Sequence, residues 1–321
     1  MLIAQGPLRV SLFGGGSDLP IFLRDNVGAV LSFAIDRRVF IAGHPFTHRS
    51  GILLKYSQIE DVEHPSQLQH PIAREVLQRY GVTDVDLAVM ADVPAGTGLG
   101  SSSAFTVAFL ALVRRMKGLD STPADLAREA CEIEIEILRE PIGYQDQWAS
   151  AVGGINVLRF DSSDVTVERV AVDAATISKL QSNLKLIAVG SPRRARSVLA
   201  DQESSITPGS TQEDATRGLV SMVDDGLAAL KGSMDDLGPL LGEAWARKKR
   251  IAPQASNEAI DALYERGLAA GATGGKLLGA GGSGYVAFYV PETAHQRFSE
   301  QMPKELPFSI ASEGAGVIHE S

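Results

Sequence analysis

Residues 94–104 read Pro-Ala-Gly-Thr-Gly-Leu-Gly-Ser-Ser-Ser-Ala and lead directly into an apolar run that predicts a helix over 102–116. The first N–H groups of a helix have no partner within it and lie at the positive end of its dipole, so a helix start attracts anions. Glycines let the preceding backbone wrap a polyphosphate, and serine hydroxyls add donors or a ligand for Mg²⁺. The segment therefore predicts a phosphate site, although it also fits a glycine-rich connection with a serine cap.

This segment is not a Walker A loop, because that loop needs Gly-Lys-Ser/Thr and no lysine lies between Pro94 and Arg114. It is one of three glycine clusters, and the others lie at 14–16 and 271–284. The three clusters are far apart in the chain. Any shared purpose therefore requires the fold to bring them together.

The C-terminal cluster contains a literal G-x-G-x-x-G at 279–284, which is the dinucleotide-binding pattern. That pattern binds a dinucleotide only when a strand precedes it and a helix follows it. Here we expect the reverse, with a helix at 256–270 before the glycines and a strand at 285–290 after them. We therefore reject a dinucleotide site and leave open a tight loop that packs beside the phosphate site.

Composition narrows the class of protein. The chain has 321 residues, 44% of them hydrophobic, which suits two domains of ordinary size. Its net charge of −9 disfavours nucleic acid or an anionic membrane surface as a partner. The single cysteine, Cys131, rules out an intramolecular disulfide. Neither a signal peptide nor an apolar run long enough to span a membrane is visible, so we expect a soluble, cytoplasmic protein.

The order of the expected elements suggests two parts. Most of the first hundred residues predict strands, followed by helices over 102–116 and 124–139. A polar segment at 201–214 contains Pro-Gly-Ser and is the best linker in the chain. Three helical stretches, a strand, a further helix near 292–302 and a final strand follow it. This order fits an α+β fold with a smaller domain packed on the first.

One glutamate stands out on the expected helix 124–139. At about 100° per residue its apolar side chains share one arc, and Glu134 falls near the centre of that arc. The arc comprises Leu126, Ala127, Ala130, Ile133, Ile137 and Leu138. Burying an unpaired carboxylate is expensive, so Glu134 needs a partner. An arginine or a cation would serve, and the neighbouring phosphate site favours Mg²⁺.

After this helix the chain reads Gly-Tyr-Gln-Asp-Gln at 143–147. Asp146 in this turn fits a helix cap as well as it fits a catalytic base. Serine-based hydrolysis lacks support because no G-x-S-x-G pattern occurs.

Three segments together resemble the GHMP superfamily of small-molecule kinases over nearly the full chain. They are residues 7–18 (Pro-Leu-Arg-Val-Ser-Leu-Phe-Gly-Gly-Gly-Ser-Asp), 94–104 and 274–284. Within the superfamily, Gly-Gly-Gly-Ser-Asp combined with Gly-Tyr-Gln-Asp-Gln is most similar to the D-glycero-D-manno-heptose 7-phosphate kinases. The galactokinase pattern Gly-Glu-His is absent at 14–16.

The resemblance implies a two-domain architecture, with an N-terminal domain like ribosomal protein S5 domain 2 and a ferredoxin-like C-terminal domain. We place the first at 1–200, binding nucleotide, Mg²⁺ and substrate, and the second at 201–321. ATP and Mg²⁺ are the implied cofactors, and the sugar would lie between the domains. A homodimer is left open.

Residue roles carry over by position. Asp146 would be the catalytic base, Arg9 would neutralise phosphoryl charge, and Ser102 and Glu134 would serve Mg²⁺. The residues implied in nucleotide binding are Pro94, Gly96, Thr97, Gly98, Leu99, Gly100, Ser101, Ser102 and Ser103. Those implied in substrate binding are Gly15, Gly16, Ser17, Asp18, Arg193, Gly281 and Gly282. Arg193 belongs to a basic run that also fits an ordinary solvated face.

The expected activity is phosphorylation of the anomeric hydroxyl of D-glycero-D-manno-heptose 7-phosphate by ATP, in the synthesis of nucleotide-activated heptose for surface polysaccharide. Two alternatives stay open at this point. The acceptor could be an unphosphorylated hexose or another small alcohol, or the chain could be a catalytically silent sugar–nucleotide sensor.

Overall fold

The structure is a computed structural model that describes residues 1–162, 164–190 and 206–321. Its larger sheet is built on two long antiparallel strands, β1 (Leu2–Phe13) and β2 (Gly28–Pro45). The other strands of this sheet are β3 (Ile52–Lys55), β4 (Ile59–Val62), β5 (Val85–Ala91), β6 (Ile155–Phe160), β7 (Val165–Arg169) and β11 (Gly316–Glu320).

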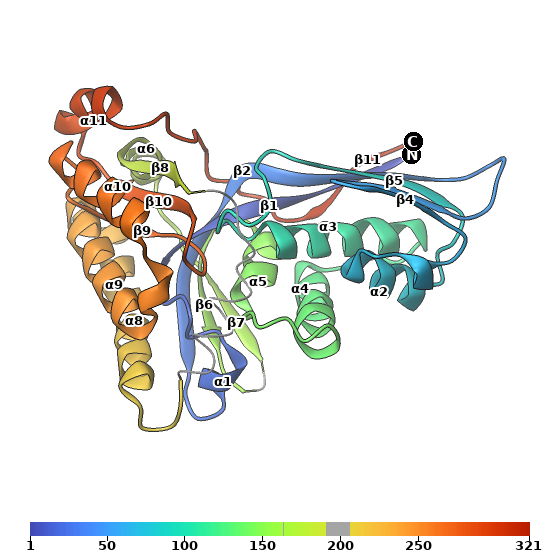
Figure 1. The fold of residues 1–321 in the computed structure, drawn as a ribbon, viewed down its shortest axis with the longest axis horizontal. Coiled ribbons are helices and arrows are strands. Elements are labelled where there is room, and N and C mark those ends of the chain that lie inside the picture. The colour runs from blue at the N-terminus through green and yellow to red at the C-terminus, as the bar shows by residue number, and fades with distance from the viewer. Residues whose placement is uncertain (163, 191–205) are drawn as a thin grey trace.

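This sheet forks along β2. The second half of β2 pairs with β5, whereas its first half pairs with β6. The two halves are separated by a break in the β1–β2 register after Pro7, and such a bulge bends the strand and increases its twist. Figure 1 shows the two branches diverging, with β6 and β7 turned away from β4 and β5.

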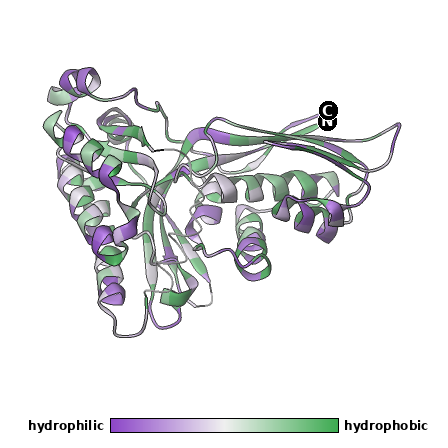
Figure 2. Ribbon diagram, viewed as in Figure 1, coloured by the Kyte–Doolittle hydropathy of each residue, from purple (hydrophilic) through white to green (hydrophobic). Residues whose placement is uncertain are grey.

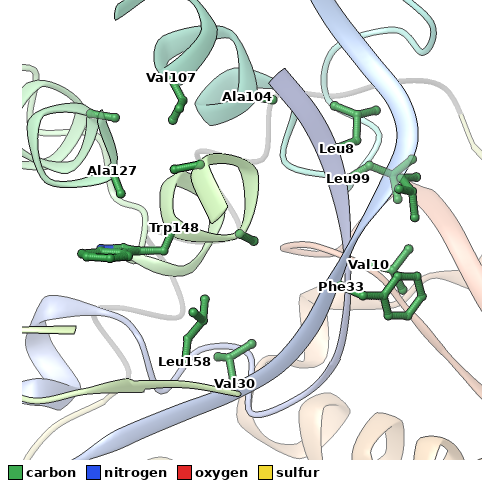
Figure 3. Packing of buried hydrophobic residues seen from close by; sticks show 14 of the residues in the cluster. Leu8, Val10, Val30, Phe33, Leu99, Ala104, Val107, Ala127, Trp148 and Leu158 are labelled. Carbon is green, nitrogen blue, oxygen red and sulfur yellow. The ribbon is translucent and has the colours of Figure 1, made fainter. Parts of the chain in front are cut away.

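A group of helices covers one face of the forked sheet (Figure 1). They are α2 (Pro71–Tyr80), α3 (Ser101–Met116), α4 (Pro123–Cys131) and α5 (Gln145–Val152). Every residue of α3 from Ser103 to Val113 is buried, as expected of a central helix that is apolar nearly all round. The hydrophobic colour along α3 in Figure 2 marks the same property. Figure 3 shows Val107 of α3, Trp148 of α5 and Leu158 of β6 in this core.

The second sheet is small and antiparallel, in the order β8-β10-β9. Its strands are β8 (Leu184–Val189), β9 (Gly274–Leu277) and β10 (Gly284–Tyr289). Leu306 bridges to Leu186 at the outer edge, where a fourth strand would lie. With that bridge the order matches a ferredoxin-like sheet. The expected α+β, two-domain architecture is therefore confirmed.

The described residues after β8 form four helices of seven or more residues. They are α8 (Thr211–Lys231), α9 (Leu237–Ile251), α10 (Glu258–Ala269) and α11 (His295–Gln301). Helix α8 packs on α9 and on β1 and β2 of the larger sheet. Its Gly226 makes this possible because a Cβ there would lie 2.3 Å from the ring of Phe13. The remaining elements are α1 (Pro20–Leu23), α6 (Ala174–Asn183), the 3₁₀ turns η1 (Pro65–Gln67), η3 (Met234–Asp236), η4 (Pro253–Ala255) and η5 (Glu292–Ala294), and the π-helix η2 (Glu132–Ile137).

The sheets do not divide the chain at residue 200 as expected. Strand β8, which ends at Val189, already belongs to the second sheet, and β11 returns to pair with β1. The polar segment 201–214 misled the prediction because it follows the first strand of the second sheet instead of preceding it. The two termini consequently lie side by side (Figure 1), with the N–H of Ser321 bonded to the carbonyl of Met1 at 3.0 Å. None of the described helices is long and apolar enough to cross a membrane.

Candidate active site

The loop between β5 and α3 approaches the helix without a side-chain cap. Gly100 is the N-cap residue of α3, with φ of 76°, and no side chain caps the helix. The alternative of a serine cap is therefore wrong. The N–H groups of the first turn keep no capping side-chain partner, which is the arrangement that favours an anion. Gly96 and Gly98 also have positive φ, 78° and 79°, so this loop follows a path that favours glycine.

The C-terminal glycines pack directly against this loop. A Cβ on Gly98 would lie 2.6 Å from the carbonyl oxygen of Leu278, and one on Gly279 would lie 2.4 Å from the Cα of Gly98. A Cβ on Gly284 would likewise lie 2.5 Å from the carbonyl oxygen of Thr97. The two clusters are thus in backbone contact, as the sequence had left open.

The element before the C-terminal glycines differs from the expectation. Strand β9, and not a helix, immediately precedes them, because its Gly-Gly-Lys-Leu sequence pairs with β10. A strand still follows the glycines, so the condition for a dinucleotide site is not met. Gly281 and Gly282 lie against η4, where the N–H of Gly282 donates to the carbonyl of Ala255 at 2.8 Å.

Arg9 and Asp146 form a bidentate ion pair beside the same loop. The Nε of Arg9 donates to Oδ1 of Asp146 at 2.8 Å, and Nη2 donates to Oδ2 at 2.9 Å. The third donor, Nη1, reaches the carbonyl of Gly98 at 2.5 Å. Asp146 lies in the first turn of α5, but the N-cap residue is Tyr144 and no side chain caps this helix. The helix-cap alternative for Asp146 is therefore wrong.

A second carboxylate, Asp18, lies buried next to Asp146. It accepts hydrogen bonds from the N–H of Gly16 at 3.0 Å, from the N–H of Gln145 at 3.2 Å and from the side-chain amide of Gln145 at 2.9 Å. Gly143 permits this contact, because a Cβ there would lie 2.0 Å from Oδ2 of Asp18. Burial, and then the charge of Asp146, raise the pKa of Asp18.

Gly15 and Ser17, from the N-terminal cluster, lie in different surroundings: Gly15 borders the site, whereas Ser17 is buried. Gly15 lies where an added Cβ would be 3.9 Å from the side-chain amide nitrogen of Gln145, so it borders the Asp18 pocket. Ser17 is fully buried, and its hydroxyl both donates to the carbonyl of Ala29 and accepts from the N–H of Ala29. The hydroxyl of Ser17 therefore links the loop to β2, and the expected part of Ser17 in substrate binding stays a prediction.

Glu134 lies on a π-helix and not on the expected α-helix. Helix α4 ends at Cys131, and the chain continues as η2, whose wider turns shift the positions of the side chains. Ile137, which the expected arc placed in the core, is consequently 41% exposed, whereas Glu134 is only 1% exposed. Single π-turns are frequent at functional sites.

The hydrogen-bond donors to Glu134 among the described residues are uncharged. Its Oε1 accepts from the hydroxyl of Ser102 at 3.3 Å, and its Oε2 accepts from the side-chain amide of Gln147 at 2.8 Å. No basic side chain pairs with it in the part of the chain that the structure describes, so the alternative of an internal arginine partner is wrong there. Burial raises the pKa of Glu134 to about 7, with hydrogen bonds such as that from Gln147 opposing the effect and the charge of Asp146 adding to it.

Two further charged residues, Lys276 and Lys248, lie near this site and were not predicted from the sequence. Lys276 of β9 is buried, and its Nζ donates to the carbonyls of Ser11 at 3.1 Å and Leu12 at 2.9 Å. Lys248 of α9 donates to the carbonyl of Gly279. Lys276 stands inside the third glycine segment and could have been noticed there, but nothing local distinguishes Lys248. Arg193 lies outside the described residues.

The chain is similar to known proteins along most of its length. The family model described as GHMP kinases N terminal domain matches residues 68–154, and the one described as GHMP kinases C terminal matches residues 227–307. Together these segments cover more than half of the chain.

Individual relatives extend over nearly the whole length. The chain is 26% identical, over 97% of its length and 96% of the relative's, to a D-glycero-alpha-D-manno-heptose 7-phosphate kinase of Campylobacter jejuni. It is 24% identical, over 90% of each protein, to a mevalonate kinase of Methanothermobacter thermautotrophicus. The crystal structure of a D-glycero-D-manno-heptose 1-phosphate kinase from Bacteroides thetaiotaomicron superposes with a TM-score of 0.82, at 24% identity and 100% coverage of both chains, and shows the shared fold.

Proposed function

The chain belongs to the GHMP kinases and is an ATP-dependent sugar kinase, and we propose that its acceptor is the anomeric hydroxyl of D-glycero-D-manno-heptose 7-phosphate. The product would be a heptose 1,7-bisphosphate, an intermediate suited to nucleotide activation of heptose for surface polysaccharide. The observation that carries the proposal is the group of Asp146, Arg9 and Asp18 at the glycine loop. The relative named as a heptose 7-phosphate kinase supports this choice of sugar.

Asp146 is the proposed base. Its carboxylate is 24% exposed, unlike the buried Asp18 and Glu134, so an acceptor hydroxyl can reach it. The bidentate contact with Arg9 holds it in one orientation. A carboxylate held in this way accepts the hydroxyl proton as the hydroxyl oxygen attacks the γ-phosphorus. Binding of sugar hydroxyl groups by Asp18, which is only 2% exposed, stays what the family resemblance implies, and Gln145 fixes the orientation of its carboxylate.

The nucleotide is proposed to lie along residues 94–103, with its phosphates at the uncapped start of α3. Ser102 and Glu134 fit a magnesium ion there, because an exposed hydroxyl lies 3.3 Å from a buried carboxylate that lacks a basic partner among the described residues. Within those residues no group of three or more His, Cys, Asp or Glu could hold a metal. This agrees with Mg²⁺ bound by one or two protein ligands together with phosphate oxygens. Bound there, Mg²⁺ would neutralise charge on the phosphates.

The position of the transferred phosphate is the sharpest test. We would incubate the protein with ATP, Mg²⁺ and four acceptors: D-glycero-D-manno-heptose 7-phosphate, the free heptose, mannose and galactose. Product regiochemistry would be read by ³¹P and ¹H NMR. The expected result is a 1,7-bisphosphate, with kcat/KM at least about 100-fold above that for the free heptose, since a lost phosphate contact leaves its binding group unpaired. Preference for an unphosphorylated hexose, or phosphorylation at another carbon, would refute the proposal.

A further inference from the structure

The ammonium group of Lys248 lies at the contact between the two halves of the molecule. It reaches from the last turn of α9 to the carbonyl oxygen of Gly279. Gly279 in turn packs on Gly98, whose carbonyl accepts a hydrogen bond from Arg9. Lys248 and Arg9 therefore approach the same glycine contact, one from each half of the molecule.

Arg9 and Lys248 differ in how many of their N–H donors already make hydrogen bonds. Arg9 makes three hydrogen bonds, two to Asp146 and one to Gly98, which hold the proposed base and the loop in place. Lys276 is also occupied, because its two bonds to β1 tie the small sheet to the large one. For Lys248 the described residues supply one hydrogen bond, to Gly279, so two of its three N–H donors stay available.

The electrostatic environment of Lys248 calls for an anion. Burial and the charge of Arg9 lower the pKa of Lys248 to about 8, and Asp18 opposes them only in part. Lys276 is close enough for its own pKa to be lowered by burial, by Lys248 and by Arg9. Three basic side chains therefore lie close together, near the carboxylates of Asp18 and Asp146. They are those of Arg9, Lys248 and Lys276. A phosphoryl group at this point would relieve the repulsion among them.

We propose that Lys248 is a catalytic residue whose ammonium group binds the phosphoryl group while it passes from ATP to the acceptor hydroxyl. This inference rests on the proposed kinase function. In the step, the hydroxyl oxygen forms a bond to the γ-phosphorus, and the bond from that phosphorus to the bridging oxygen breaks with its electron pair left on ADP. The hydroxyl proton goes to Asp146, and Lys248 contributes hydrogen bonds and charge without transferring a proton.

The test substitutes Lys248→Gln, because glutamine removes the positive charge and keeps an N–H donor on a side chain that is one atom shorter. The matched control is Lys249→Gln, since Lys249 is the adjacent residue but pairs with Asp261 and lies over the ring of Trp245. We expect kcat to fall by about 100-fold or more for Lys248→Gln, the usual loss for one transition-state donor. The control should stay within about threefold, and Lys248→Arg should recover part of the rate. Thermal unfolding of each variant verifies that it folds.

A second readout does not depend on the acceptor. We would measure binding of Mg²⁺–ADP with and without aluminium fluoride, which mimics the phosphoryl group in transit. Lys248→Gln should bind Mg²⁺–ADP within about threefold of the unsubstituted protein but lose most of the gain in affinity that the fluoride gives. Equal gain in both proteins, or an unchanged kcat, would overturn the role of Lys248. If the unsubstituted protein phosphorylates none of the sugars, the proposed function fails, and the fluoride measurement still decides whether Lys248 binds the transferred group.

Discussion

Replacing Glu134 by glutamine should stabilise the protein at alkaline pH and leave its stability nearly unchanged at acidic pH. Burial raises the pKa of Glu134 from its ordinary value of 4.5 to about 7. A group whose folded pKa is raised contributes its full stability below the unfolded pKa, and this contribution is lost as the pH rises through the folded pKa. Each pKa unit corresponds to about 1.4 kcal/mol. The ionised carboxylate therefore lowers the free energy of unfolding by about 3 kcal/mol at pH 8, and by less than about 1 kcal/mol at pH 5.

Glutamine removes this titration with little change in shape. The Oε1 of Gln147 is buried without a hydrogen-bond partner, so turning that amide would let it accept from the new amide at position 134. We therefore expect Glu134→Gln to be more stable than the unsubstituted protein by about 3 kcal/mol at pH 8 in the absence of nucleotide and metal. Asp18 also has a raised pKa, but it is present in both proteins and cancels in the comparison.

Urea unfolding of both proteins at pH 5 and pH 8 measures the effect. Glu136→Gln, at an exposed position of the same π-helix, is the matched control and should change the free energy of unfolding by no more than about 0.5 kcal/mol at either pH. Equal differences between Glu134→Gln and the unsubstituted protein at the two pH values would refute the reasoning, because a packing effect does not depend on protonation.

Glu134→Gln should have opposite effects on stability and on nucleotide binding. A carboxylate that lowers stability in the free protein is best explained by a bound cation that needs it. Glu134→Gln should therefore weaken Mg²⁺-dependent nucleotide binding while the protein itself becomes more stable at pH 8. An unchanged Mg²⁺ requirement would contradict the metal role of Glu134.

Two further substitutions test the base and the glycine contact. Asp146→Asn should lower phosphoryl transfer by about 1,000-fold or more and leave ATP affinity within about threefold, since the amide cannot accept the hydroxyl proton; full activity in a coupled kinase assay would exclude Asp146 as the base. Gly98→Ala should lower the free energy of unfolding by about 2 kcal/mol or more, because φ is 79° and the new Cβ would lie 2.6 Å from the carbonyl oxygen of Leu278. Gly316→Ala, where an added Cβ meets nothing within 4 Å, is its control, and equal denaturation midpoints for the two variants would count against the contact.

Elements with local signals could be predicted from the sequence. Pro71 and Gly81 predict a helix over 71–80, and the residues before Asp92-Val93-Pro94 predict a strand over 85–91. Both elements occur with these bounds, and Gly81 ends the helix in a left-handed conformation. Strand β9 was missed, since two of its four residues are glycines and it exists through pairing with β10. The boundary between the two parts was missed for the same reason, because strand pairing and not polarity places β8 in the second sheet.

In the candidate site, too, some features could be predicted from the sequence and others depend on the fold. The burial of Glu134 could be predicted because the apolar arc of α4 continues for two residues beyond its end, to Ile133 at the start of η2. Its partners could not, because Ser102 and Gln147 reach it from two other helices. Lys248 had no local signal, since its importance comes from a contact with Gly279 that only the fold creates.

The glycines and the charged residues have different tasks in this site. Gly98 of the N-terminal half contacts the backbone of the C-terminal half, and Gly279 and Gly284 contact the backbone of the N-terminal half. These glycines therefore set how closely the two halves approach. The N-terminal half then supplies Arg9 with the carboxylates, and the C-terminal half supplies Lys248. A chain with a net charge of −9 repels a polyphosphate at long range. Attraction must therefore come from groups within a few ångströms, which requires the backbone contact that the glycines allow. A kinase of this design loses the charge of Lys248 from the site whenever that contact opens.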